Sequence, residues 1–113
     1  MTFVSDTVAG FMAAGLTAGI DGMTLNLGTG KTYSVGWFAA RLLALIGVDK
    51  PIVQEEHRMR PELSEVLKLV SDNTLSREKM NWAPRVTLDD GLLQTIEFVK
   101  ANRHLFRTNG YVT

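Results

Sequence analysis

The stretch "RMRPELSEV", residues 58–66, holds the side chains of this sequence that are best suited to binding an anion. Pro61 stiffens the backbone after Arg60, and a guanidinium group held there can bind a phosphate through two parallel hydrogen bonds. Glu65 follows in the same stretch, and its carboxylate can accept hydrogen bonds from the two hydroxyls of a ribose. The same spacing also fits an exposed loop in which an arginine and a glutamate form a solvated ion pair.

A second candidate is "LGTGKT", residues 27–32, which has the glycine, lysine and threonine of a phosphate-binding loop. The full motif requires a glycine five positions before Gly30, and the sequence has Leu25 there. A dinucleotide-binding loop requires a third glycine at the position of Tyr33. We therefore expect a glycine-rich turn between a strand and a helix, and no cofactor loop.

Metal binding and hydrolysis receive no support from the remaining polar residues. His57 and His104 are far apart in the sequence, and the chain has no cysteine, so a metal site is not expected. Ser34 and Ser64 have no base close to them in the sequence, and a serine without a base is not a nucleophile.

Composition limits the remaining classes of function. With 113 residues, 45% of them hydrophobic, the sequence predicts a single domain over residues 1–113. Twelve basic residues balance twelve acidic ones, so we expect no nucleic-acid partner and no attraction to an anionic membrane. The apolar run "WFAARLLALIGV" contains Arg41 and is shorter than the roughly 20 residues of a membrane span. The missing cysteines and the missing secretion signal favour a cytoplasmic protein.

Capping residues and apolar periodicity predict four helices. The first is capped by Ser5 or Asp6 and continues to Gly15 or beyond, with its large apolar side chains on one face that needs a partner. The second is capped by Ser34, ends before Gly47 and is apolar almost all round, so we expect it to be buried on most sides. The third is capped by Asp72 or Thr74 and continues to Met80, and the last begins after Thr87 and has apolar residues from Leu88 to Val99 along one side.

Two short apolar stretches predict strands that complete the fold. Residues 23–27 are bounded by glycines and are too short for a buried helix, and Pro51 opens the similar stretch "PIVQEE". The predicted fold class is therefore α+β, a small helix-dominated domain with two or more short strands.

Several stretches, taken in order, resemble the C-terminal part of the extended short-chain dehydrogenase/reductases, the NAD-dependent nucleotide-sugar epimerases and 4,6-dehydratases. The similar stretches are "FVSDTVAGF", "NLGTGKTYSV", "RPELSEV", "SDNTLSREKMNWAP" and "LDDGLLQTIEFV". Together they span nearly the whole chain in the order of the family. The resemblance implies a portion of an extended Rossmann-type enzyme in which Arg60 contacts the diphosphate of a nucleotide sugar and Glu65 contacts its ribose.

The same resemblance implies that the catalytic parts of the family are missing from this chain. The family's NAD-binding glycine loop and its Tyr-x-x-x-Lys pair lie upstream of the similar region, and Tyr33 is followed four positions later by Trp37. We therefore expect a truncated, catalytically silent homologue that holds no NAD and binds a nucleotide sugar or nucleoside diphosphate weakly. Two alternatives are a small oligomeric interaction module with a vestigial site, and a subunit that completes an enzyme with a separate NAD-binding chain.

The apolar surfaces that such a domain would leave uncovered predict self-association. Without an NAD-binding domain, the helix at residues 35–46 and the strand near Leu25 and Leu27 need another partner, because large exposed apolar patches are unusual on monomers. We expect a homo-oligomer, most simply a two-fold dimer.

Overall fold

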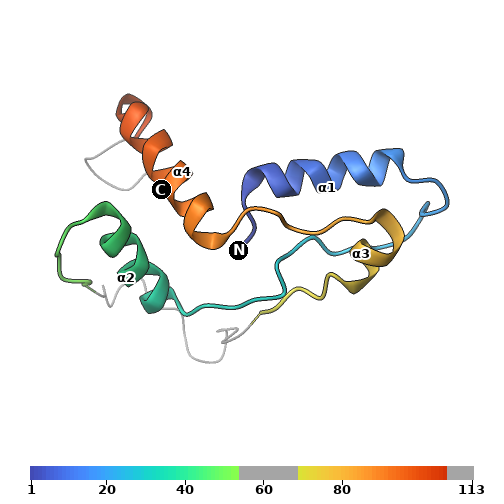
Figure 1. The fold of residues 1–113 in the computed structure, drawn as a ribbon, viewed down its shortest axis with the longest axis horizontal. Helices are drawn as coiled ribbons and strands as arrows, with labels where there is room; N and C mark the ends of the chain where they lie inside the picture. The colour runs from blue at the N-terminus through green and yellow to red at the C-terminus, as the bar shows by residue number, and fades with distance from the viewer. Residues whose placement is uncertain (54–68, 107–113) are drawn as a thin grey trace, which may run out of the picture.

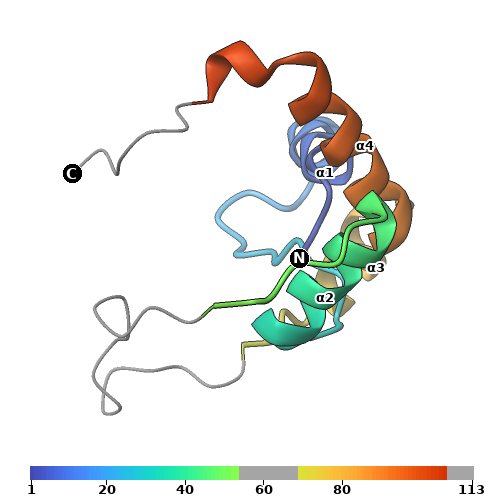
Figure 2. The same ribbon diagram turned by 90° about the vertical axis from the view of Figure 1, so that its left-hand side faces the viewer.

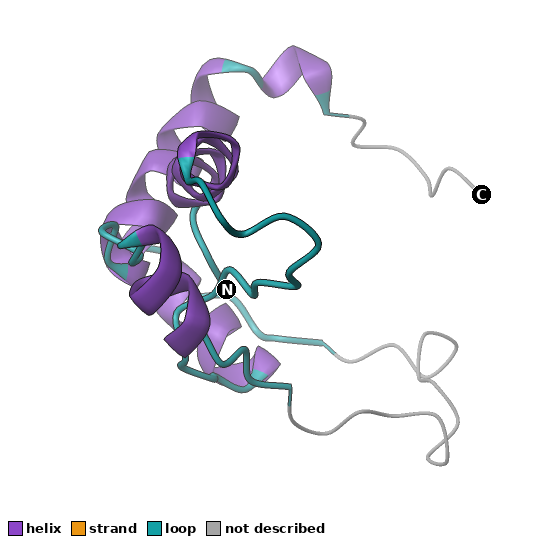
Figure 3. Ribbon diagram, turned by 90° about the vertical axis from the view of Figure 1, so that its right-hand side faces the viewer, coloured by secondary structure: helices purple, strands orange, loops and turns teal. Residues whose placement is uncertain are grey.

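The computed structural model describes residues 1–53 and 69–106, and these residues form four α-helices and one 3-10 turn. The elements in chain order are α1 (Val4–Leu16), α2 (Val35–Ile46), α3 (Thr74–Met80), α4 (Leu88–Ala101) and η3 (Arg103–Leu105). Figure 1 shows α1 and α3 at one end of the molecule, α2 and α4 at the other, and extended stretches of chain between the two ends. Turned by 90°, the helices form a curved layer with the loop after α1 on its inner side (Figures 2 and 3).

The predicted α+β fold class is wrong, because no strand occurs in the parts of the chain that the structure describes. Residues 23–27 form no strand and pair with none among the described residues. Their neighbourhood is held by α3 instead: Ser76 Oγ donates a hydrogen bond to the carbonyl of Asn26, and Asn73 Nδ2 donates one to the carbonyl of Gly28. A strand requires a ladder of backbone hydrogen bonds to a neighbouring strand. Here the carbonyls of Asn26 and Gly28 accept hydrogen bonds from side chains instead. Residues 51–53 are also not a strand, and the rest of "PIVQEE" lies outside the described residues.

The helix predictions are confirmed where a local cap determines the helix end. Ser34 Oγ accepts a hydrogen bond from Trp37 N at 3.1 Å, and Gly47 ends α2 with a φ of 75°. Thr87 Oγ1 accepts a hydrogen bond from Asp90 N at 3.2 Å at the start of α4. The predicted cap of the first helix is wrong, because α1 begins after Phe3, which makes no side-chain cap, and Asp6 lies inside the helix.

The described core is small for a chain of this length. The buried apolar side chains within the described residues are those of Met80, Trp82, Leu92 and Ile96. None of the 12 residues of α2 is buried, so the expectation that this helix is buried on most sides is wrong. The radius of gyration is 17.5 Å, whereas a compact chain of 113 residues has about 13 Å. The described residues are thus loosely packed, and they leave apolar helix faces without cover among themselves.

None of the helices within residues 1–53 and 69–106 is both long enough and apolar enough to span a membrane.

Candidate functional site

The buried carboxylate of Asp6 fixes one wall of the candidate site. Its two carboxylate oxygens accept hydrogen bonds from the backbone amides of Arg85, at 3.1 Å, and Val86, at 3.0 Å. The carbonyl oxygen of Asp6 accepts a third hydrogen bond, from the indole Nε1 of Trp82 at 2.9 Å. Only 5% of Asp6 is exposed, so these bonds satisfy a carboxylate that would otherwise be costly to bury. As a result, the stretch from Trp82 to Val86 is held across the first turns of α1.

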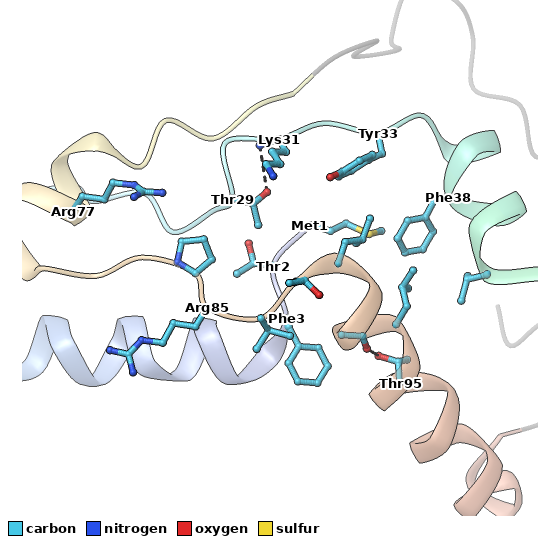
Figure 4. A pocket seen from close by; sticks show the side chains of 17 residues that line it. Met1, Thr2, Phe3, Thr29, Lys31, Tyr33, Phe38, Arg77, Arg85 and Thr95 are labelled. Carbon is cyan, nitrogen blue, oxygen red and sulfur yellow. Dashed lines mark hydrogen bonds between the residues drawn. The ribbon is translucent and has the colours of Figure 1, made fainter. Parts of the chain in front are cut away.

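The opposite wall is the loop at residues 28–33, which α3 holds in place through Asn73 and Ser76 as described above. Within the loop, the backbone amide of Lys31 donates a hydrogen bond to Thr29 Oγ1 at 3.3 Å. Gly30 has a φ of 70°, a left-handed conformation that glycine adopts without strain. The turn carries the chain past α3 to the start of α2. It places Lys31 and Tyr33 on the same side of the molecule (Figure 4).

Between these walls lies a cavity of about 490 Å³, which we call the groove. It is lined by residues 1–3 and by parts of the stretches 29–33 and 84–95. The remaining lining residues are Phe38 and Leu42 of α2 and Arg77 of α3. This volume lies within the range of small-molecule sites in proteins, which is about 300–1,000 Å³.

The two ends of the groove differ in chemistry. Arg77 and Arg85 lie at one end, Lys31 lies near the middle, and Tyr33 and Phe38 lie at the other end (Figure 4). The lining includes these three cations and no aspartate or glutamate. In a chain with equal numbers of acidic and basic residues, such a lining concentrates positive charge locally. One end therefore suits an anion, and the other suits a flat apolar group.

Arg77 is oriented by its own helix. Its Nε donates a hydrogen bond to Asn73 Oδ1 at 3.0 Å, one turn earlier, and the other guanidinium nitrogens form no hydrogen bond within the described residues. No carboxylate in the described residues forms an ion pair with Lys31, Arg77 or Arg85. A phosphate entering the groove would therefore displace no acidic partner that belongs to the described residues.

Asp89 and Arg41 join α4 to α2 beside the apolar end of the groove. Arg41 Nε donates a hydrogen bond to Asp89 Oδ1 at 2.8 Å, and Arg41 Nη2 donates a second one to Asp89 Oδ2. The side-chain hydrogen bonds from Arg41 lower the pKa of Asp89, and the pair raises the pKa of Arg41. Tyr33 and Trp37 stack nearby with ring centroids 4.5 Å apart. These contacts position the aromatic end of the groove.

The structure places neither of the predicted site residues, since Arg60 and Glu65 lie outside the described residues. His57 and Ser64 lie outside them as well, whereas His104 is exposed in η3. Sequence reasoning did not find the cations of the groove. Lys31 belongs to an incomplete phosphate loop, Arg77 lies in the similar stretch "SDNTLSREKMNWAP" without a predicted role, and Arg85 belongs to no predicted motif.

The glycine-rich turn differs from a nucleotide-binding loop in its packing and in its distance from α2. A β-carbon built on Gly28 would lie 2.5 Å from Ser71 Cβ, so this glycine is required by close packing against Ser71. Nucleotide loops lead directly into a helix whose N-terminus faces the phosphates, whereas α2 begins only at Val35. The described residues also hold no group of three or more His, Cys, Asp or Glu side chains that could bind a metal ion.

Comparison with curated proteins finds nucleotide-sugar epimerases. The chain is 35% identical over 99 residues to a UDP-glucose 4-epimerase of Mycolicibacterium smegmatis, and the match covers 87% of this chain and 30% of that protein. It is 32% identical over 109 residues to GDP-mannose 3,5-epimerase 1 of Oryza sativa, in both the indica and japonica subspecies, and this match covers 96% of the chain and 27% of the relative. The chain thus spans less than a third of the length of these relatives. No family model and no solved structure matches it.

Proposed function

We propose that this chain, a partial-length homologue of the NAD-dependent epimerase family, binds the nucleoside diphosphate portion of a nucleotide sugar and does not catalyse epimerisation on its own. The observation that carries the proposal is the lining of the groove, which combines three cations, no carboxylate and an aromatic end. A nucleoside diphosphate has the matching parts, namely two charged phosphates next to a flat base.

The proposed contacts follow from the chemistry of each end. Arg77 and Lys31 would contact the phosphates, because hydrogen bonds between cations and phosphate oxygens are the strongest polar contacts that such side chains form. Tyr33 and Phe38 would pack against the base or sugar. From the resemblance, Arg60 would contribute a further phosphate contact and Glu65 would bind the ribose.

The absence of activity in the chain alone is also part of the proposal. The sequence contains no Tyr-x-x-x-Lys pair, and Gly28 of the glycine-rich turn packs against Ser71. The chemistry of the relatives, if this chain takes part in it, would require a cofactor-binding portion supplied from elsewhere. The competing proposal, an interaction module with a vestigial site, predicts no nucleotide binding at all.

Isothermal titration calorimetry tests the proposal directly. UDP-glucose, GDP-mannose, UDP and GDP would each be titrated into the chain at low ionic strength. We expect a dissociation constant on the order of a millimolar, roughly 4 kcal/mol of binding free energy, because only part of the family's binding surface is present. Each sugar nucleotide should bind about as well as its nucleoside diphosphate, since the phosphates carry most of the contacts.

Two exposed cations on α3 provide a matched pair of variants. Arg77→Gln should weaken binding by about tenfold or more, because a charge-assisted hydrogen bond contributes about 1.5–3 kcal/mol. Lys79→Gln removes a charge from the same helix outside the groove and should change the affinity by less than about twofold. Equal effects of the two variants would show that the attraction is general and that the groove is not the site.

Two variants in the stretch outside the described residues test the phosphate contact that the resemblance implies for Arg60. Arg60→Ala should remove most of the binding, while Arg58→Ala, two residues earlier and outside the similar motif, should have only a salt-dependent effect. If none of the four nucleotides binds the wild-type chain, the nucleotide-binding proposal is refuted.

A further inference from the structure

A second cavity lies beside the groove, between α2 and the first turn of α4. Its volume is about 730 Å³, which is within the range of small-molecule sites. The residues that line both this cavity and the groove are Lys31, Tyr33, Thr87 and Leu88. Lys31 lies between Arg77 and Tyr33 (Figure 4). A ligand whose phosphates contact Arg77 and Lys31 can therefore continue past Tyr33 into the second cavity.

The second cavity contains two exposed aromatic rings that are already stacked. Tyr33 and Trp37 have an interplanar angle of 22°, and the two residues are 39% and 45% exposed. Ala40 and Ala44 follow Trp37 by one and two turns along α2, and both line the cavity. Side chains of this size leave the space along this side of α2 open. A flat ring can enter the space and extend the stack, since aromatic rings bind one another in offset-stacked arrangements.

The ion pair of Arg41 and Asp89 gives the second cavity a polar wall. Arg41 binds Asp89 through Nε and Nη2, and its Nη1 forms no hydrogen bond within the described residues. The two carboxylate oxygens of Asp89 each accept one hydrogen bond in the pair and can accept another. The wall thus offers donors and acceptors together, and the edge of every nucleobase carries both as well. Hydrogen bonding to this wall accepts any base, so the area of the stacked ring is what discriminates between bases.

The charges of the second cavity favour a ligand over a protein surface as its occupant. Lys31, Arg41 and Asp89 all line it. A protein segment packed over the cavity would take these groups out of water, which is costly unless each gains a partner. A nucleotide supplies phosphate oxygens for Lys31, a flat ring for the aromatic pair, and a polar edge for the ion pair.

We propose that the second cavity binds the base of the nucleotide, stacked on Tyr33 and Trp37, and that it favours purine over pyrimidine nucleotides. The inference rests on the proposed function and adds the position and the class of the base. A purine has two fused rings, so it covers more of the aromatic pair than the single ring of a pyrimidine and stacks more strongly. The apolar end of the groove at Phe38 is then left for the sugar. The site therefore favours GDP compounds over UDP compounds.

Calorimetric titration of GDP and UDP into the full chain and three variants tests the proposal. We expect the wild type to bind GDP about fivefold more tightly than UDP. Trp37→Ala should weaken GDP binding about tenfold and reduce the preference to less than about twofold, because the base loses its stacking partner. Arg77→Gln should weaken both nucleotides by the same factor and keep the preference. Phe98→Ala removes an exposed ring of α4 that lines neither cavity, so it should leave both affinities unchanged. Circular dichroism checks that each variant keeps its helices.

Nuclear magnetic resonance of the wild-type chain provides a measurement that does not rely on a weakened variant. The two tryptophans give two indole N–H signals, and comparison with Trp37→Phe identifies the signal of Trp37. GDP should shift this signal through the ring current of the stacked base, whereas pyrophosphate has no ring and should leave it in place. The indole of Trp82 is buried and bound to Asp6, so its signal serves as the reference.

The outcomes separate this inference from the proposed function. If Arg77→Gln weakens both nucleotides but UDP binds as tightly as GDP, or Trp37→Ala changes neither affinity, this inference is overturned and the proposed function stands. Equal shifts of the Trp37 signal with GDP and with pyrophosphate would overturn it in the same way. If no nucleotide binds the wild-type chain, both proposals are refuted.

Discussion

Replacing Asp6 with alanine tests the central structural inference, that one buried carboxylate holds the wall of the groove. Asp6→Ala removes the acceptor of two backbone amides, those of Arg85 and Val86. A hydrogen bond to a charged group contributes about 1.5–3 kcal/mol, and partial access of water to these amides reduces the loss. The better helix propensity of alanine returns about 0.5 kcal/mol. We therefore expect Asp6→Ala to lower the free energy of unfolding by about 2–4 kcal/mol.

A loss of this size is a large fraction of the roughly 5–15 kcal/mol that stabilises a typical domain. The small core of the described residues places the free energy of unfolding of this chain toward the lower end of that range. Urea denaturation followed by the fluorescence of the buried Trp82 provides the measurement. Asp21→Ala removes an exposed carboxylate and should change the free energy of unfolding by less than about 0.5 kcal/mol. If both variants shift the urea midpoint equally, Asp6 does not hold the wall, and the reasoning is refuted.

Two further predictions follow from contacts between distant parts of the chain. Gly28→Ala should destabilise the fold, because the new β-carbon would lie 2.5 Å from Ser71 Cβ, and Ser71→Gly should restore much of the loss in the double variant; purely additive effects in thermal unfolding would contradict this. The bond from Arg41 lowers the pKa of Asp89 from its ordinary value of 3.8, so this pair stabilises the fold at neutral pH and the contribution is lost as the pH falls through the lowered pKa. Asp89→Asn should therefore flatten the acid side of the stability profile, whereas Asp49→Asn, at an exposed carboxylate, should leave it unchanged.

The sequence predicts those parts of the fold that depend on neighbouring residues. Ser34 and Thr87 cap helices through hydrogen bonds to residues three positions away, and Gly47 ends a helix by its own conformational freedom. Such interactions are local, so the residue types are enough to identify them. The same local reasoning assigned Asp6 to a helix cap, and this was wrong because Asp6 binds amides 79 and 80 residues away.

The missing strand at residues 23–27 and the lining of the groove could not be predicted, because both depend on residues that are distant in the sequence. A strand at residues 23–27 depends on a neighbouring strand, and the side chains of Asn73 and Ser76 took its place. The cations of the groove come from two loops and one helix that are adjacent only in three dimensions. The resemblance to epimerases succeeded where spacing failed, because it compares the order of whole stretches along the chain.

The contacts of Asp6 also determine when the groove can form during synthesis. Its partners lie about 80 positions later in the chain, and closing a loop of that size costs about 4 kcal/mol of entropy before any contact is gained. The helices α2 and α4 have their own caps and need no such closure. During synthesis, α1 therefore emerges long before residue 86 can bind it, and the carboxylate of Asp6 lacks these two amide partners for that time.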